Sequence, residues 1–394
     1  MLTEAGMADF RGGTGTEPML LTAHVDASDR QAAAKLRQAL GMQPFAVIFL
    51  FISPEADLGH VASSIAHHFA GELVVGCTTA GEISPRGYTQ GEIVAIGLRA
   101  DFFVADAIMV GDLTNLGSED LIGRLIRLRQ TLAGQRPHWD DEFAFLMSDG
   151  MAMREDELMA ALAPGLGPLP LFGGSAGDGV RFERSFVFRD GQMIRNAAIV
   201  TLVRTCCRVR VFSLDHLRPS QTRMVVTAAD PARRLVREIN GEPAAEEYAR
   251  LVGRDPGQLT PFTFAAHPVV VRLGGRHHVR SIRQVMENGD LAFYSAIDEG
   301  LVLTLAEPEP IVEHLERTLA GLSAVGRPEA IIACDCILRR MEAEEKQLTG
   351  RLSAVLRANR VIGFSTYGEQ LHTMHVNQTM TGVALYPPST LVSR

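Results

Sequence analysis

The chain has 394 residues, which favours two or three domains, and its 46% hydrophobic content is enough for large buried cores. Its formal net charge of −8 at pH 7 argues against nucleic acids and anionic membranes as partners, because both bind basic surfaces. Five cysteines in a chain of this size do not suggest a disulfide framework, so we expect a cytoplasmic protein.

Residues 1–20 are expected to form a disordered arm, because they are rich in glycine and threonine and lack the apolar core of a signal peptide. The longest apolar run, FAVIFLFI at 45–52, is much shorter than the roughly twenty residues that a membrane-spanning helix needs. It is interpreted as a buried strand. Residues 388–394 are expected to be a tail.

The same series of elements is predicted three times along the chain. In the first unit an apolar strand at 45–53 is followed by a helix at 57–69, a glycine-rich loop at 74–82 and a strand at 93–98. The same elements are predicted at 143–148, 155–162, 171–178 and 197–203, and again at 330–334, 341–356, 361–369 and 379–385.

The glycine-rich loops read VVGCTTAGE, LFGGSAGD and VIGFSTYGE. Taken singly, their glycines are expected to be close-packed corners, their hydroxyls local caps, and Glu82 and Glu369 acceptors of nearby backbone hydrogen bonds. Because the three corners would lie at equivalent sheet positions, the alternative is that they line one shared ligand cavity. The candidate residues in that cavity are Gly76, Thr78, Gly173, Ser175, Gly363 and Ser365.

A strand, helix and strand in succession imply a parallel pair, and the strand after each loop is expected to return antiparallel. The predicted fold is α/β (mixed α+β), with mixed sheets that carry helices on one face. We assign two units to an N-terminal domain at 21–228 and the third to a C-terminal domain at 229–387. The C-terminal domain starts with a turn at Asn240-Gly241 and a helix near Pro243. The ligand is expected between the two domains.

Several of these motifs resemble the FIST family of sensory domains. VVGCTTAGE and LFGGSAGDG resemble its N domain, whereas EINGEPAAEEY, HPVVV, HVRSI and GFSTYGE followed by HVNQT resemble its C domain. The resemblance covers roughly residues 20–387 and implies a sensor. The sequence has no Gly-x-Ser-x-Gly or His-Glu-x-x-His motif, so we expect that the chain is not an enzyme.

Within the family, ACDCILRRME and MHVNQTMTGVAL are most similar to the bacterial nitric-oxide-sensing haem proteins (NosP). That resemblance implies a haem-binding sensor of nitric oxide. It would regulate a histidine kinase or a cyclic-di-GMP enzyme, a diguanylate cyclase or phosphodiesterase, on another chain, and a homo-oligomer is compatible with this role. The alternative within the family is a haem-free sensor of a small metabolite such as an amino acid.

A haem sensor needs an axial ligand, which is often imidazole. His216 ends an apolar strand, and His375 follows the third glycine loop, so both rank ahead of His267 as iron ligands. Arg280 and Asn377 align with the FIST C motif. The arginine could bind a haem propionate or another carboxylate, and for both residues a local structural role is the alternative.

Thiol chemistry gives two further alternatives. Cys77 could be the nucleophile of a thiol enzyme, but its equivalents are Gly174 and Phe364, so a buried cysteine is favoured. A zinc or redox site could use Cys206, Cys207, Cys334 and Cys336, although their spacing is not Cys-x-x-Cys. Arg339 and Arg340 open a helix and could contact a partner.

Overall fold

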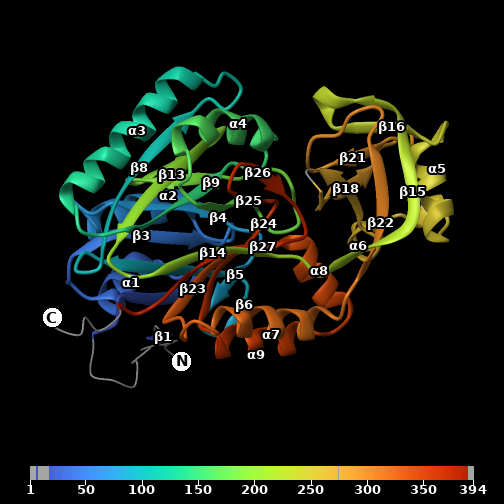
Figure 1. Cartoon of the computed structure of the whole chain (residues 1–394). Helices are drawn as coiled ribbons and strands as arrows, with labels where there is room; N and C mark the ends of the chain where they lie inside the picture. Colours follow the sequence, from blue (N-terminus) through green and yellow to red (C-terminus); the bar gives the residue numbers. More distant parts are fainter. Residues whose placement is uncertain (1–5, 8–16, 274, 389–394) are drawn as a thin grey trace.

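The computed structural model describes residues 6–7, 17–273 and 275–388 (Figure 1). Residues 1–5 and 8–16 of the predicted arm, and 389–394 of the predicted tail, lie outside the described residues. Within the arm, β1 (Gly6–Met7) pairs antiparallel with β2 (Leu20–Asp26), and Met19 is fully buried. The packed chain therefore includes part of the segment that the sequence assigned to a disordered arm.

The first sequence unit forms a mixed sheet. β3 (Phe45–Ile52) and β4 (Val74–Thr78) are parallel neighbours, and β7 (Glu92–Arg99) returns antiparallel beside β3. β2 lies antiparallel to β7 at the outer side. The predicted parallel pair and antiparallel return are confirmed.

The same strand order recurs in the other two units, which confirms the predicted α/β fold with three related mixed sheets. The edge strands had not been predicted as parts of the units, because they are partly exposed and lack continuous apolar runs. The second sheet contains β8 (Phe103–Gly111), β13 (Ala197–Thr205), β9 (Asp141–Ser148) and β10 (Leu171–Ser175), and the third contains β14 (Val209–Leu214), β27 (Met380–Leu385), β23 (Ala330–Cys336) and β24 (Val361–Thr366).

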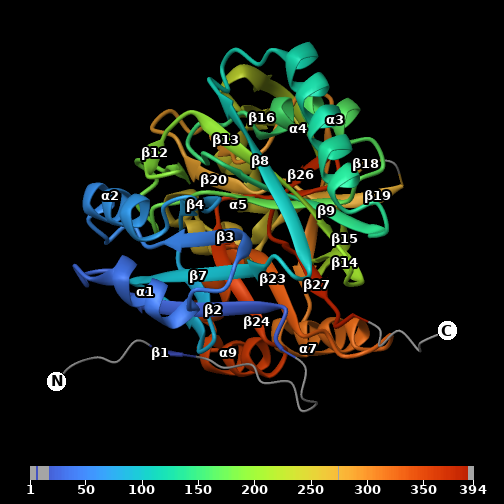
Figure 2. The same cartoon turned by 90° about the vertical axis from the view of Figure 1, so that its left-hand side faces the viewer.

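Helices cover the outer face of each sheet, and Figure 2 shows the three helical layers on different sides of the strands. The helix predicted at 341–356 is two helices, because the chain reverses at Gln347, where φ is +57°. The layers are α1 (Ala32–Leu40) with α2 (Leu58–His68), α3 (Ser118–Gln135) with α4 (Glu155–Leu166), and α7 (Ile311–Leu322) with α9 (Thr349–Ala358), while α8 (Ile337–Glu345) precedes α9.

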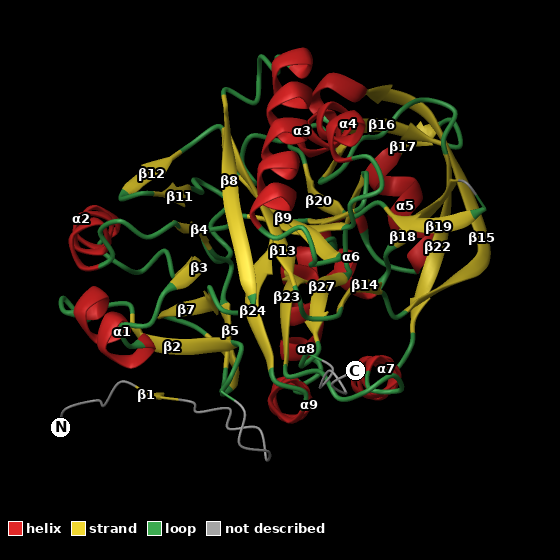
Figure 3. Cartoon of the chain, turned by 60° about the vertical axis from the view of Figure 1, so that its left-hand side comes forward, coloured by secondary structure: helices red, strands yellow, loops and turns green. Residues whose placement is uncertain are grey.

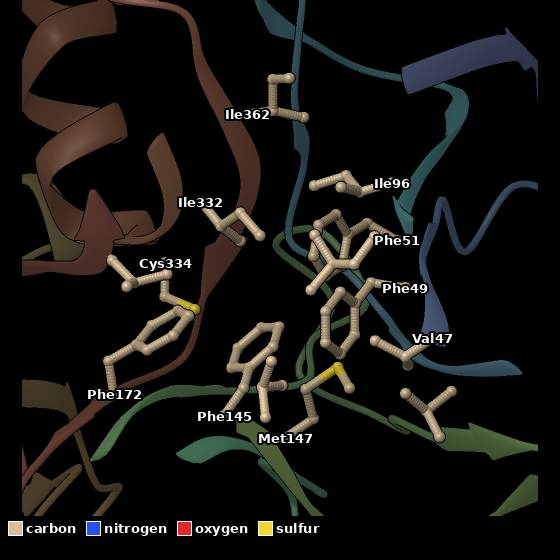
Figure 4. Packing of buried hydrophobic residues seen from close by; sticks show 14 of the residues in the cluster. Val47, Phe49, Phe51, Ile96, Phe145, Met147, Phe172, Ile332, Cys334 and Ile362 are labelled. Atoms are coloured by element: carbon tan, nitrogen blue, oxygen red, sulfur yellow. The ribbon is translucent and has the colours of Figure 1, made fainter. Parts of the chain in front are cut away.

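The inner faces of the three sheets share one core, shown in Figure 4. The ring of Phe51 stacks on that of Phe364 with centroids 4.7 Å apart, and Phe145 stacks on Phe172 at 4.5 Å. Phe49 meets Phe145 edge-on at 5.0 Å. These rings come from all three units, so the units bury their largest side chains against one another.

After each glycine loop, a short hairpin leaves its own unit and extends the sheet of another. The hairpin of the first unit joins the third sheet, that of the third unit joins the second, and that of the second unit joins the first. The exchange is therefore cyclic. The hairpins are β5 (Glu82–Ser84) with β6 (Gly87–Thr89), β11 (Val187–Arg189) with β12 (Gln192–Ile194), and β25 (Glu369–Leu371) with β26 (Met374–Val376).

Residues 217–308 form a separate lobe, which lies to the right of the three-sheet body in Figure 1. The lobe is inserted between β14 and α7, where the other two units pass from their edge strand to their first helix (Figure 3). It consists of β15 (Leu217–Asp230), β16 (Leu235–Ile239), β17 (Glu242–Pro243), α5 (Ala244–Val252), α6 (Pro261–Ala266), β18 (Val269–Leu273), β19 (Arg276–Val279), β20 (Ile282–Val285), β21 (Leu291–Phe293) and β22 (Val302–Pro308).

The sequence boundary at 228 and 229 falls inside β15, which carries the chain across it without a break. The predicted turn is present, with positive φ at Asn240 and Gly241, and α5 begins directly after Pro243. The third unit packs with the first two and not with the lobe alone, because its strands complete the shared core.

Across the described ranges, no helix has the length and apolar character to cross a membrane.

Candidate functional site

The three glycine corners meet inside the body, where backbone hydrogen bonds join them to one another. At equivalent positions, one backbone N–H of each corner donates to a carbonyl oxygen of another corner. The hydrogen bonds run from Ala80 to Ser365 (2.9 Å), from Tyr367 to Ser175 (3.2 Å) and from Gly177 to Thr78 (3.1 Å). They close a ring, so these N–H groups are satisfied within the protein and do not face a ligand.

The first glycine of each corner has a packing role. A Cβ atom on Gly76, Gly173 or Gly363 would lie 2.1, 2.4 or 1.7 Å from the carbonyl oxygen of the neighbouring strand. No real side chain tolerates such a distance. The three oxygens belong to Leu50, Leu146 and Ala333, which stand at equivalent positions in β3, β9 and β23.

The hydroxyl groups of the three corners differ in their hydrogen-bond partners. Thr78 Oγ1 accepts from the N–H of Phe186 (3.0 Å), and Ser175 Oγ accepts from Gln370 Nε2 (3.0 Å). Ser365 Oγ is buried and has no hydrogen-bond partner among the described residues. The prediction that these hydroxyls cap local N–H groups is therefore wrong for Thr78 and Ser175, whose partners lie 108 and 195 residues away in the chain and connect different units.

Glu82 and Glu369 act as the sequence predicted. Their carboxyl groups are fully buried and accept hydrogen bonds from local groups. Burial raises the pKa of each carboxyl group to about 8, although the hydrogen bonds that the groups accept act to lower it. The donors are Thr79 Oγ1 and the N–H of Glu92 for Glu82, and Thr366 Oγ1 with the N–H and Oγ1 of Thr379 for Glu369.

A polar cluster lies where the lobe meets the third corner. Gly368 touches it directly, because a Cβ there would lie 2.3 Å from His375 Cε1 and 3.0 Å from Asn377 Nδ2. From the lobe, Ser295 Oγ donates to Asn377 Oδ1 at 2.7 Å. Arg280, also from the lobe, lies within electrostatic reach of His375. The structure thus brings together three of the predicted site residues: Arg280, His375 and Asn377.

Several polar atoms of this cluster are buried without a hydrogen-bond partner in the described part of the chain. Native proteins rarely leave such atoms unsatisfied, so each one calls for water or a ligand. Neither Ser281 nor Gln378 was among the predicted site residues, although they lie in the motif stretches HVRSI and HVNQT. The atoms are Arg280 Nε, Ser281 Oγ and His375 Nδ1. Gln378 Oε1 is also buried without a partner, but the Nε2 of the same amide donates to the carbonyl oxygen of Ala265 in α6.

The Arg280 side chain is a buried cation without a carboxylate of its own. The residue is 9% exposed, and burial lowers the pKa of its guanidinium, although Asp156 opposes this. The nearby carboxylates are occupied, since Arg234 Nη2 lies 3.1 Å from Glu155 Oε2 and 3.5 Å from Asp156 Oδ2. Within the described ranges, no ion pair includes Arg280.

The hydrogen bonds of Asn377 define the tautomer of His375. Asn377 Oδ1 accepts a hydrogen bond from Ser295, so the Asn377 atom that lies 3.4 Å from His375 Nε2 is Nδ2. An amide nitrogen can only donate a hydrogen bond. His375 Nε2 therefore holds a lone pair, and in the neutral ring Nδ1 carries the hydrogen. Burial lowers the pKa of His375, which favours this neutral form. The cluster presents Nδ1–H as a donor.

His216 lies elsewhere, and both of its ring nitrogens are engaged. Arg339 Nη1 donates to Nδ1 at 2.7 Å, so Nε2 carries the hydrogen and donates to Glu342 Oε2 at 2.7 Å. Arg339 also donates to Asp335 at 2.8 Å. The prediction that Arg339 and Arg340 contact a partner is wrong, because both are buried in the body.

This buried network lies at the hinge of the lobe. The carbonyl oxygen of His216 accepts from the N–H of Glu309 at 2.6 Å, which joins the segments that enter and leave the lobe. Burial lowers the pKa of His216, whereas its hydrogen bond to Glu342 acts to raise it.

His267 is also separate from the polar cluster. It is half-buried at the end of α6, and its carbonyl oxygen accepts a hydrogen bond from Tyr248.

The cysteines do not form a common site. Cys77, Cys207, Cys334 and Cys336 are buried, whereas Cys206 is exposed. Burial raises the pKa of the Cys77 thiol well above its ordinary value, which disfavours a nucleophilic thiolate. The described residues contain no group of three or more His, Cys, Asp or Glu side chains arranged to hold a metal. The geometry supports neither the thiol-enzyme nor the zinc alternative.

Comparison with protein families gives two adjoining matches. Residues 46–242 match the FIST N domain and residues 244–372 match the FIST C domain. The two matches meet inside the lobe, next to the start of α5. An uncharacterized protein of Methanocaldococcus jannaschii is 24% identical over 381 residues, which covers 86% of this chain and 72% of that protein.

Replacing Gly363 by alanine tests the packing role of the corners. We expect Gly363→Ala to lower the free energy of unfolding by about 3 kcal/mol or more, because its Cβ would collide with backbone that cannot move aside. Gly111→Ala is the control, since open space surrounds Gly111. Urea unfolding followed by circular dichroism measures both, and equal stability of the two variants would contradict the assigned role.

The hinge network predicts a dependence of stability on pH. Since the pKa of His216 is lowered in the folded protein, the unfolded chain binds more protons below the ordinary histidine value of 6.5. Stability is therefore lost as the pH falls below that value. We expect His216→Gln to be about 1–3 kcal/mol less stable at pH 7 and to lose less on going to pH 5 than the wild type.

The control is His67→Gln on the exposed face of α2. It should keep both the stability and the pH dependence of the wild type in denaturant melts. An unchanged pH dependence in His216→Gln would show that the network does not titrate in this range.

Proposed function

This chain belongs to the FIST family and carries both of its domains in order. On that premise we propose that it is a sensory protein, and that it binds a small carboxylate-bearing metabolite between the lobe and the body. FIST domains are sensor domains of signal transduction, and this broad role applies to the whole matched region, 46–372. The observation that carries the proposal is the buried guanidinium of Arg280, which lacks a carboxylate partner in the described structure.

A carboxylate supplies what this cluster lacks. Arginine binds carboxylates through two parallel N–H bonds, and a buried guanidinium gains most from such a partner. The Nδ1–H of His375 and the hydroxyl of Ser281 are additional donors without acceptors. Amino acids and other small carboxylic acids are ligands that match these groups in charge and in hydrogen-bonding capacity.

Binding at this place would couple the ligand to the position of the lobe. Arg280 and Ser281 belong to the lobe, whereas His375 belongs to the body, so a ligand that contacts both favours the arrangement in which they are close. A partner protein would read that arrangement. The resemblance to sensors that act in trans makes a histidine kinase, a diguanylate cyclase or a phosphodiesterase the proposed partner.

Haem with nitric oxide sensing is the second candidate. The observation in its favour is that His375, a proposed ligand, has a buried nitrogen without a partner. Ligation through Nδ1 requires the other tautomer and a turned Asn377 amide, whereas ligation by His216 requires the loss of a hydrogen bond to Arg339 or Glu342. A haem held here would supply gas binding, and Arg280 would meet its propionates.

A ligand screen tests the first candidate. We expect some amino acids or small carboxylic acids to raise the melting temperature of the full chain, and Arg280→Met to weaken their binding at least tenfold, because the guanidinium is lost. Arg272→Met, at an exposed position of the same lobe hairpin, is the matched control and should bind normally. Retained binding in Arg280→Met would overturn the proposed site.

A haem titration tests the second candidate. The expected result is a Soret band that shifts on addition of nitric oxide and that His375→Ala abolishes, while His67→Ala keeps it. Purified protein that stays colourless with added haem would remove this candidate. The same preparation can still respond to carboxylates in the ligand screen, so the two candidates are tested separately.

A further inference from the structure

A cavity of about 380 Å³ lies between the lobe and the body, apart from the Arg280 cluster. Its walls come from β14 and the turn after it, from β19 of the lobe and from the β25–β26 hairpin. Met374 and Val376 line the cavity, whereas His375 between them faces the Arg280 cluster, because successive strand side chains point to opposite faces. The hairpin therefore separates two different sites.

One part of the cavity lining is rich in groups that bind anions. It contains three imidazoles and one guanidinium but only one carboxylate among the described residues, Asp215, whose Oδ1 accepts from the N–H of Leu217 at 3.3 Å. The cationic or potentially cationic side chains are Arg210, His277, His278 and His372.

The rest of the lining is largely apolar. Such a division suits a ligand that has a charged head and an organic body, and the volume falls in the range of small-molecule sites. The apolar side chains are Val211, Phe212, Val279, Leu371, Met374 and Val376.

Metal binding does not account for the three histidines. In the part of the chain that the structure describes, no three His, Cys, Asp or Glu side chains are placed to share a metal ion. Imidazole N–H groups and a guanidinium instead donate hydrogen bonds to anionic oxygens. The lining is therefore suited to an anion with several acceptors.

We propose that this cavity binds a small organic phosphate. A phosphate monoester carries a charge of about −1.5 to −2 at pH 7 and has three acceptor oxygens, which match several donors better than a carboxylate does. The phosphate would lie against Arg210 and the histidines, and the organic group against the apolar wall. This inference does not depend on the ligand proposed for Arg280, since the two sites share no lining residue.

Calorimetric titration of the full chain with phenyl phosphate and with inorganic phosphate tests the proposal. Phenyl phosphate is expected to bind the wild type, and inorganic phosphate more weakly, because it cannot use the apolar wall. The double variant Arg210→Met/His372→Asn should bind phenyl phosphate at least tenfold more weakly. Asparagine is chosen because position 372 has a positive φ of 52°, which asparagine tolerates.

Arg357→Met, at an exposed position of α9 outside the cavity lining, is the control and should bind phenyl phosphate as the wild type does. If circular dichroism shows that the double variant is unfolded, the single variant His277→Gln, at an exposed position, takes its place. It should also bind phenyl phosphate more weakly than the wild type. No binding of phenyl phosphate to the wild type, or unchanged binding in a folded cavity variant, would overturn the site. Equal affinity for inorganic phosphate would overturn the assignment of an organic phosphate.

Discussion

The structure depends on the ring of backbone hydrogen bonds between the three glycine corners. Each corner lets its chain leave one sheet and join another, and the exchanged hairpins make every sheet complete only when all three units are present. Glycine is required here because the strands approach within a distance that excludes any Cβ atom. The units therefore fold as one body, with a shared aromatic core.

The exchanged hairpin of the third unit also shapes both candidate ligand sites. One face of β26 carries His375 to the polar cluster at the lobe, and the other face lines the neighbouring cavity. The lobe supplies the opposite wall of each, through Arg280 and through His277 to Val279. Because both sites span the lobe and the body, ligand binding at either would bias the position of the lobe.

The connection between lobe and body contains its own buried charges. His216 stands between Arg339 and Glu342, and Arg339 also pairs with Asp335, while the His216 carbonyl joins the two connecting segments. Removing one member of such a network leaves another charge buried and unpaired, which costs more than the network contributes. His216, one of the two histidines ranked first as iron ligands in the sequence, thus has both ring nitrogens engaged in this connection.

Local patterns in the sequence determined the repeated units, the parallel strand pairs, the glycine corners and the hydrogen bonds of Glu82 and Glu369, because each depends on residues close together in the chain. They also indicated His375 by its place after the third glycine loop, and Arg280 and Asn377 through their alignment with a family motif. Only the tertiary structure decided the exchange of hairpins, the insertion of the lobe and the partners of His216. It also decided that Arg280 has no carboxylate partner among the described residues. These features depend on which segments hundreds of residues apart pack together, and burial then sets the cost of each charge that they leave unpaired.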